Sequence, residues 1–154
     1  MINNAVSQSR QLSVGVPQGS VLGPLLFLLY ISPLSQIIDS FSISRHGYAD
    51  DTQLYCRLPT RNLDEIRATI ARMNSCICAV RSWMLKNKLK INDEKTEMMM
   101  LGSKGALETI RPLDVKIRVG TSEILPTDCV RNLGVILDPA LSMEKQVAAT
   151  TRAS

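Results

Sequence analysis

Two adjacent carboxylates, Asp50 and Asp51, are the residues of this sequence best suited to hold a metal ion. Transfer of a phosphoryl group from a nucleoside triphosphate needs two divalent ions about 4 Å apart, held by carboxylates. Adjacent residues in a regular strand point to opposite faces, so both carboxylates can approach one site only where the backbone turns sharply. Asp is also a favoured residue of ordinary turns. The pair alone therefore leaves both interpretations open and favours the turn.

A glycine-containing loop precedes this pair and suggests a second element of a site. Its residues are Gly15, Val16, Pro17, Gln18, Gly19 and Ser20. Two glycines and a proline permit a sharp loop whose backbone can closely approach a nucleotide or another backbone. A loop that only leads into a helix, with Ser20 as its N-cap, would have the same composition.

Periodicity on either side of the acidic pair predicts the elements that position it. The continuous apolar run 25–31, after a proline suited to a first helical turn, predicts a helix buried on most sides beneath a sheet. Phe41 and Ile43 alternate with serines, and Tyr48 then leads through the acidic pair into 52–55, a pattern that predicts two short strands meeting at an acidic turn. Apolar residues at spacings of three and four over 63–84, with Asn62 and Glu65 as a capping box, predict a helix packed on a sheet. A coiled coil would share that stripe.

The second half of the chain predicts mostly short strands. We expect a strand over 96–101, a hairpin from 115–119 and 123–125, a strand over 130–137, and a helix that begins within 142–154. Together these patterns predict an α+β domain whose antiparallel sheet has helices packed on one face.

Composition excludes several classes of protein. An apolar fraction of 45% and a charged fraction of 21% are typical of a globular domain, and the net charge of +4 favours a polyanionic partner only slightly. The four cysteines form no CxxC pair, which predicts reduced thiols in an intracellular protein, nuclear or cytoplasmic. The start of the chain lacks a signal-peptide pattern, so we do not expect secretion. Prolines and polar residues interrupt the apolar run 21–38, so a membrane span is not expected.

Two stretches together resemble the reverse transcriptases of non-LTR retrotransposons, the jockey and CR1 type of LINE-like element. They are Gly-Val-Pro-Gln-Gly-Ser-Val-Leu-Gly-Pro-Leu-Leu-Phe and Tyr-Ala-Asp-Asp-Thr-Gln-Leu-Tyr. Residues 83–96 resemble that family's next palm motif, and residues 133–137 its strand before the primer grip and thumb. The resemblance implies the C-terminal part of a palm over 1–138 and a truncated start of the thumb or connection over 139–154.

The resemblance also implies roles for individual residues. Asp50 would be a metal ligand and Asp51 would lie beside the metal site, with two Mg²⁺ ions in the complete enzyme. Lys95 would offer a cation near the leaving pyrophosphate, although a solvated lysine is the plain alternative. The template, primer and nucleotide partners would be RNA, DNA and a deoxynucleoside triphosphate. Residues that would line the primer end, the template and the incoming nucleotide are Tyr48, Ala49, Gln18, Gly19 and Ser20.

One departure from the family pattern bears on activity. The family's other metal-binding Asp lies upstream of the glycine loop, and residues 1–14 contain no Asp or Glu. We therefore expect a fragment of an RNA-directed DNA polymerase that binds metal weakly and is inactive alone. Asp93 and Glu94 also stand where a proline is more usual. The alternatives are a non-catalytic nucleic-acid-binding or interaction protein derived from a degenerate retroelement, and a structural module without a ligand.

Overall fold

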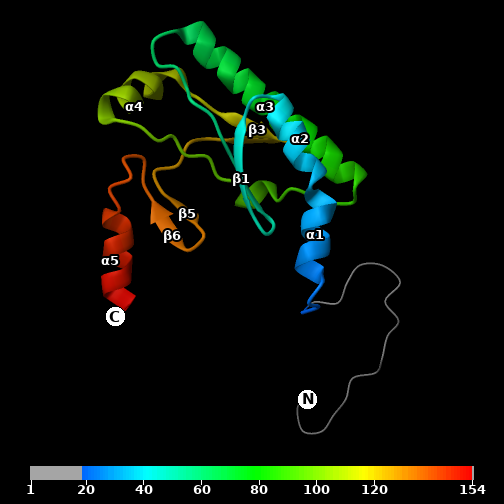
Figure 1. Ribbon diagram of the computed structural model, residues 1–154. Coiled ribbons are helices and arrows are strands. Elements are labelled where there is room, and N and C mark those ends of the chain that lie inside the picture. Colours follow the sequence, from blue (N-terminus) through cyan, green and yellow to red (C-terminus); the bar gives the residue numbers. More distant parts are fainter. Residues whose placement is uncertain (1–18, 154) are drawn as a thin grey trace.

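The computed structural model describes residues 19–153, in which helices alternate with short hairpins (Figure 1). The order is α1 (Gly23–Ile31), α2 (Pro33–Ser40), β1 (Ser44–Tyr48), β2 (Asp51–Tyr55), α3 (Leu63–Lys86), η1 (Asp93–Lys95), α4 (Lys104–Ile110), η2 (Arg111–Leu113), β3 (Ile117–Val119), β4 (Ser122–Ile124), β5 (Val130–Asn132), β6 (Val135–Leu137) and α5 (Glu144–Ala153). The predicted α+β class is confirmed.

Helix α3 is the longest element and begins where the sequence predicts. The Asn62 side chain accepts a hydrogen bond from the backbone N–H of Asp64 at 2.9 Å, and its amide donates to the Glu65 carboxylate at 3.3 Å. The Asn62 side chain thus caps the second N–H of the helix, whereas in a standard capping box it would cap the third. Glu65 contacts the Asn62 side chain and not its backbone N–H, so the capping box is modified. At the other end Lys88 takes a positive φ of 58°, which stops the helix.

The core lies along one face of α3. Ile38 of α2 and Ile43 before β1 are buried against Cys76 and Val80 of α3, and Leu54 of β2 packs on the same cluster. The same stretch of α3 also contacts β3. There the Asn74 side chain accepts a hydrogen bond from a β3 backbone N–H at 2.8 Å. The predicted packing of this helix on strands is confirmed, with α2 as an additional neighbour.

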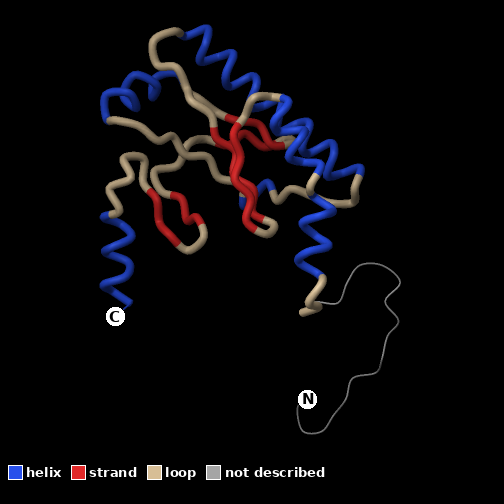
Figure 2. The backbone as a smooth tube through the Cα atoms, viewed as in Figure 1, coloured by secondary structure: helices blue, strands red, loops and turns tan. Residues whose placement is uncertain are grey.

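The strands form three separate antiparallel pairs, β1–β2, β3–β4 and β5–β6 (Figure 2). The hairpin predicted between 115 and 125 is confirmed. The single strand predicted over 130–137 is wrong, because Leu133 and Gly134 both take positive φ and form a two-residue turn inside it. The strand predicted over 96–101 is also wrong: only a bridge joins Met98 to Pro126, and a proline has no N–H with which to extend a ladder.

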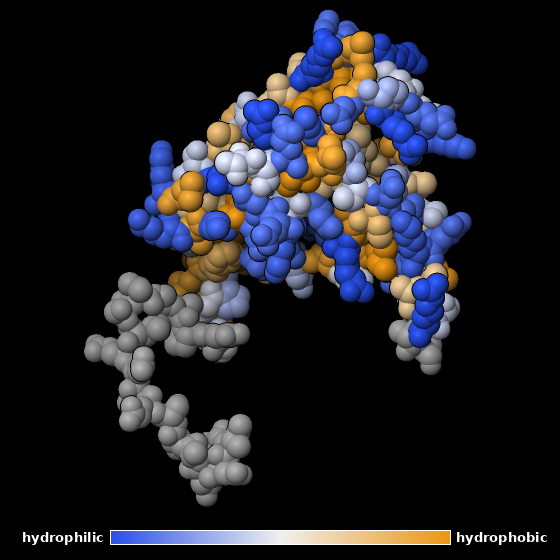
Figure 3. Space-filling model, turned by 180° about the vertical axis from the view of Figure 1, so that it is seen from behind, coloured by the Kyte–Doolittle hydropathy of each residue, from blue (hydrophilic) through white to orange (hydrophobic). Residues whose placement is uncertain are grey.

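Helix α1 forms as predicted, but its predicted burial beneath a sheet is wrong. None of its residues is buried and most of its apolar ones are exposed, with Leu29 at 64%, while α2 occupies the place beside the hairpin. In Figure 3 the apolar surface beside the larger group of grey atoms, at the lower left, corresponds to this helix. An apolar sequence on all sides of a helix favours its burial, but that pattern does not specify which element will cover it. No helix in the described part of the chain has the length and apolarity required to cross a membrane.

The four cysteines are free thiols, as predicted. Cys76 is fully buried in the core, and this burial raises the pKa of its thiol. A protonated thiol in an apolar environment is a weak nucleophile, so Cys76 serves packing.

A single carboxylate joins β6 to α5. Asp138, only 8% exposed, accepts hydrogen bonds from the backbone N–H groups of Ala140 and Ser142 at 3.0 Å, of Met143 at 3.1 Å, and from the Ser142 hydroxyl at 2.9 Å. The Ser142 backbone bond is the largest cause of the lowered pKa of Asp138, and desolvation opposes it. The ionised carboxylate therefore holds the start of α5 against the end of β6.

We predict that Asp138→Asn destabilises the chain at about pH 6, because an amide replaces one acceptor oxygen with a donor that faces other donors. The pKa of Asp138 is lower in the folded state, so the contribution of its charge is present above the unfolded pKa of about 3.9 and is lost as the pH falls through the folded value. The difference in urea midpoint between wild type and variant should therefore narrow at about pH 3. A difference that stays constant with pH would contradict this role.

Candidate active site

The acidic pair lies at the tip of the β1–β2 hairpin. Tyr48 pairs with Asp51 across the ladder, so Ala49 and Asp50 form the two-residue turn between them. Ala49 has a φ of 54°, a left-handed conformation that costs an L-residue with a Cβ roughly 1–2 kcal/mol. The sharp turn that both carboxylates need in order to share one site is thus present, as the sequence predicts.

The carboxylates of Asp50 and Asp51 are free of protein partners in the described residues. No hydrogen bond or ion pair within residues 19–153 involves either side chain, and both residues are exposed. Strained turns that present unpaired polar groups are common at functional sites. The hairpin tip therefore presents two negative charges that an external cation is able to bind.

The base of the hairpin is fixed while its tip projects (Figure 1). The Arg45 guanidinium of β1 lies 3.4 Å from the Asp39 carboxylate of α2. On the other strand, the Gln53 amide donates to the Asn132 side chain of β5 at 2.7 Å. With Leu54 packed on the core, these contacts fix the direction in which the tip points.

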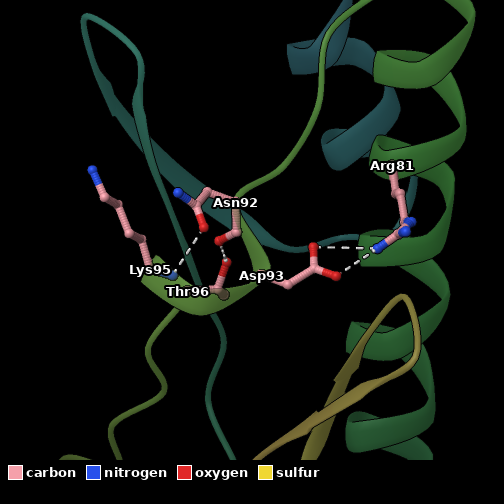
Figure 4. Close-up of polar contacts among 5 residues, drawn as sticks. All are labelled: Arg81, Asn92, Asp93, Lys95 and Thr96. Carbon is pink, nitrogen blue, oxygen red and sulfur yellow. Dashed lines mark hydrogen bonds and ion pairs between the residues drawn. The ribbon is translucent and has the colours of Figure 1, made fainter.

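Lys95 lies on η1, which local hydrogen bonds stabilise (Figure 4). The Asn92 side chain accepts from the Lys95 backbone N–H at 3.3 Å, and the Thr96 hydroxyl donates to the Asn92 carbonyl at 2.9 Å. The Lys95 side chain is exposed and points away from the other labelled residues. Ile91, just before η1, packs on the same core cluster as Leu54 of β2, so one core supports both η1 and the hairpin.

The glycine loop is described only in part. Gln18 lies outside the described residues, as do Gly15, Val16 and Pro17. Gly19 has a φ of 84°, and the Ser20 hydroxyl accepts from the Gly23 backbone N–H at 3.0 Å, although the N-cap position itself is Leu22. Ser20 thus supports the start of α1 from two residues before the N-cap, and the prediction that it is the N-cap itself is wrong.

The C-terminal end of helix α1 contacts the end of α3 and the residue that follows it. The Tyr30 ring lies 6.3 Å from the Trp83 ring, and its hydroxyl donates to the Asn87 carbonyl. Within residues 19–153 no hydrogen bond joins Gly19 or Ser20 to the acidic pair. The structure therefore groups four predicted site residues, Tyr48 to Asp51, at one tip and places Gly19, Ser20 and Lys95 on two other segments.

Sequence reasoning missed one interaction near the site. Arg81 of α3 forms an ion pair with Asp93 of η1, with its Nη1 atom 3.1 Å from the nearer carboxylate oxygen. The available signal was Asp93 itself, an acidic residue at a position where the resemblance leads one to expect proline. Arg81 and Asp93 lie on opposite sides of the chain reversal that follows α3, and no local sequence pattern predicts that they pair.

The described residues contain no group of three or more His, Cys, Asp or Glu side chains able to hold a metal ion. Asp50 and Asp51 alone supply two carboxylates. Mg²⁺ is commonly bound by one or two carboxylates, with waters and substrate phosphates as its remaining ligands. The hairpin tip therefore fits part of a Mg²⁺ site.

Comparison with known families decides the classification. The family described as "Reverse transcriptase (RNA-dependent DNA polymerase)" matches residues 1–137. The chain belongs to this reverse transcriptase family. It is also 29% identical over 161 aligned residues to a protein named "Probable RNA-directed DNA polymerase from transposon BS" of Drosophila melanogaster. The alignment covers 98% of this chain and 16% of that relative, so the chain spans about a sixth of the relative's length. No solved structure matches the chain.

Membership of the reverse transcriptase family gives the hairpin tip a chemical context. Reverse transcriptases generally use divalent metal ions, a nucleic-acid template and nucleotide substrates. Such chemistry requires exposed carboxylates and no dedicated cage made of protein alone. The unpaired carboxylates of Asp50 and Asp51 satisfy that requirement.

The strained turn yields a stability prediction. Ala49→Gly should raise the free energy of unfolding by about 0.5–1 kcal/mol, because glycine adopts a positive φ without strain. Ala49→Val should lower it, since a β-branched residue tolerates this conformation least. The matched control is Ala68→Gly on the exposed side of α3, which should cost about 1 kcal/mol. Urea denaturation measures all three, and a loss of stability in Ala49→Gly would contradict the turn geometry.

Proposed function

We propose that this chain is part of the palm of a non-LTR retrotransposon reverse transcriptase, which extends a DNA primer on an RNA template. The observation that carries the proposal is the unpaired Asp50–Asp51 tip in a chain of the reverse transcriptase family. The residues that follow the pair, Thr52 to Tyr55, favour a retrotransposon, and their combination with the glycine loop supports the jockey and CR1 type of LINE-like element.

In this proposal some residues of the chain bind metal or stabilise negative charge, and others line the bound substrates. Asp50 ligates metal and Asp51 stands beside it, while Lys95 stabilises negative charge on the leaving pyrophosphate. Two Mg²⁺ ions, when bound, neutralise phosphate charge and align the nucleotide for in-line attack. The residues that line the primer end, the template and the nucleotide are Tyr48, Ala49, Gln18, Gly19 and Ser20.

The palm portion extends over 1–138, and 139–154 begin the thumb or connection. Support comes from the match to the reverse transcriptase family, which ends at residue 137. A boundary there separates the three hairpins from the final helix.

A polypeptide of these 154 residues is proposed to be inactive alone. The described residues bring two carboxylates together at the tip, and fully aligned metal ions need further ligands. The Drosophila relative is much longer than the stretch that this chain matches, so a longer chain of its kind has additional residues to supply.

The role of Asp50 is tested in a chimaera in which this chain replaces the matching segment of the Drosophila polymerase. Asp50→Asn should reduce primer extension on an RNA template with Mg²⁺ by about a thousandfold or more, because metal alignment is lost. Asp64→Asn, at an exposed position on α3, is the matched control and should retain the parental rate. The 154-residue chain by itself should show no extension, and robust Asp50-dependent synthesis by it would contradict the proposal.

Lys95 should behave differently in the same chimaera. Lys95→Ala should slow the chemical step by roughly ten- to a thousandfold with template affinity nearly unchanged, because a cation near pyrophosphate acts in the transition state. Lys104→Ala, an exposed lysine on α4, serves as the control. Single-turnover rates of Lys95→Ala within about twofold of the parent would instead identify Lys95 as a solvated residue.

A further inference from the structure

Arg81 contacts two elements other than its own helix. From α3 its guanidinium reaches both carboxylate oxygens of Asp93 on η1, at 3.3 and 3.1 Å. The two side chains are only 31% and 22% exposed, so the pair is partly shielded from solvent. Such a pair restrains orientation more effectively than one between freely exposed side chains.

The guanidinium also lies against the turn between β3 and β4. A Cβ atom placed on Gly120 would be 1.9 Å from Arg81 Nη1 and 2.4 Å from Cζ, which shows how closely the group covers this backbone. Ser122, just beyond the turn, lines the same open cleft as residues 90–94. Arg81 thus lies where α3, η1 and the β3–β4 turn meet.

The shape of η1 transmits this contact to Lys95. In a 3-10 helix of three residues per turn, positions i and i+2 point in clearly different directions. Asp93 points toward α3 and Lys95 points away from it (Figure 4). Because Asp93 is anchored, rotation of η1 about its axis is restrained, and the direction of the Lys95 side chain is restrained with it.

We propose that Arg81 is a positioning residue for Lys95, acting through Asp93. The inference rests on the role proposed above for Lys95. It also accounts for an acidic residue where the family pattern favours proline: proline fixes φ at the first position of a helix by its ring, whereas Asp93 is fixed here by an ion pair.

The restraint itself is measured by amide hydrogen exchange in this chain. Arg81→Gln should speed exchange at Lys95 and Thr96 by about two- to fivefold, the range that corresponds to loss of an ion pair of this exposure. Arg67→Gln is the matched control, since Arg67 pairs with Asp64 at the opposite end of the same helix. Unchanged exchange at both amides in Arg81→Gln would overturn the inference.

A second variant perturbs Arg81 without replacing it. Gly120→Ala should displace the guanidinium and speed exchange at the same two amides. Gly134→Ala is its control, because Gly134 also has a positive φ but has no atom within 4 Å of an added Cβ. Equal effects of the two variants at Lys95 and Thr96 would show that backbone strain, and not Arg81, is responsible, and would overturn the inference.

The catalytic consequence is tested in the chimaera by single-turnover nucleotide addition. Arg81→Gln should lower the rate at unchanged template affinity and should add no further loss to Lys95→Ala. Additive losses of Arg81→Gln and Lys95→Ala would overturn the positioning role alone. Absence of any loss in Lys95→Ala would overturn the function proposed for Lys95, and the positioning role with it.

Discussion

The buried face of α3 is the surface on which the rest of the described molecule depends. Cys76 and Val80 receive Ile38 from α2 and Ile43 from the approach to β1, while β3 packs on the same stretch of the helix. Within the described residues no hydrogen bond or ion pair joins the hairpin tip to η1. The hairpin packs on the core of α3 through Leu54, and η1 is paired with α3 through Asp93 and Arg81. The packing of α3 therefore sets the separation between the acidic pair and Lys95.

Local sequence patterns predicted the elements better than their assembly. The spacing of three and four over α3 and the capping residues before it are properties of a single helix, and they were read correctly. The Leu133–Gly134 turn was missed because leucine is not a typical turn residue, although its φ of 46° makes it one. The burial predicted for α1 was wrong for a related reason: the apolar composition of a helix indicates that burial is favourable but not which element packs on it.

The same difference between local pattern and tertiary assembly applies to the candidate site. Two adjacent carboxylates between strand patterns required a sharp turn, and that requirement follows from strand geometry alone, so the tip at Asp50 was predictable. The pairing of Arg81 with Asp93 was not, because it links residues on either side of a helix end whose chain reversal only the tertiary structure specifies. Sequence thus identified the groups that carry charge, and the structure identified a group that orients one of them.

The three hairpins have a consequence for how such a chain acquires its structure. Each pair of strands is closed by a turn of two residues, so strand pairing requires only short loops to close. Closing a short loop costs little chain entropy, and topologies rich in local pairing fold quickly. Distant segments come together where the β1–β2 and β3–β4 hairpins pack against α3, a step of side-chain packing that does not set the register of the strands. Folding of this domain is therefore expected to be limited by assembly of its core and not by the pairing of strands across long loops.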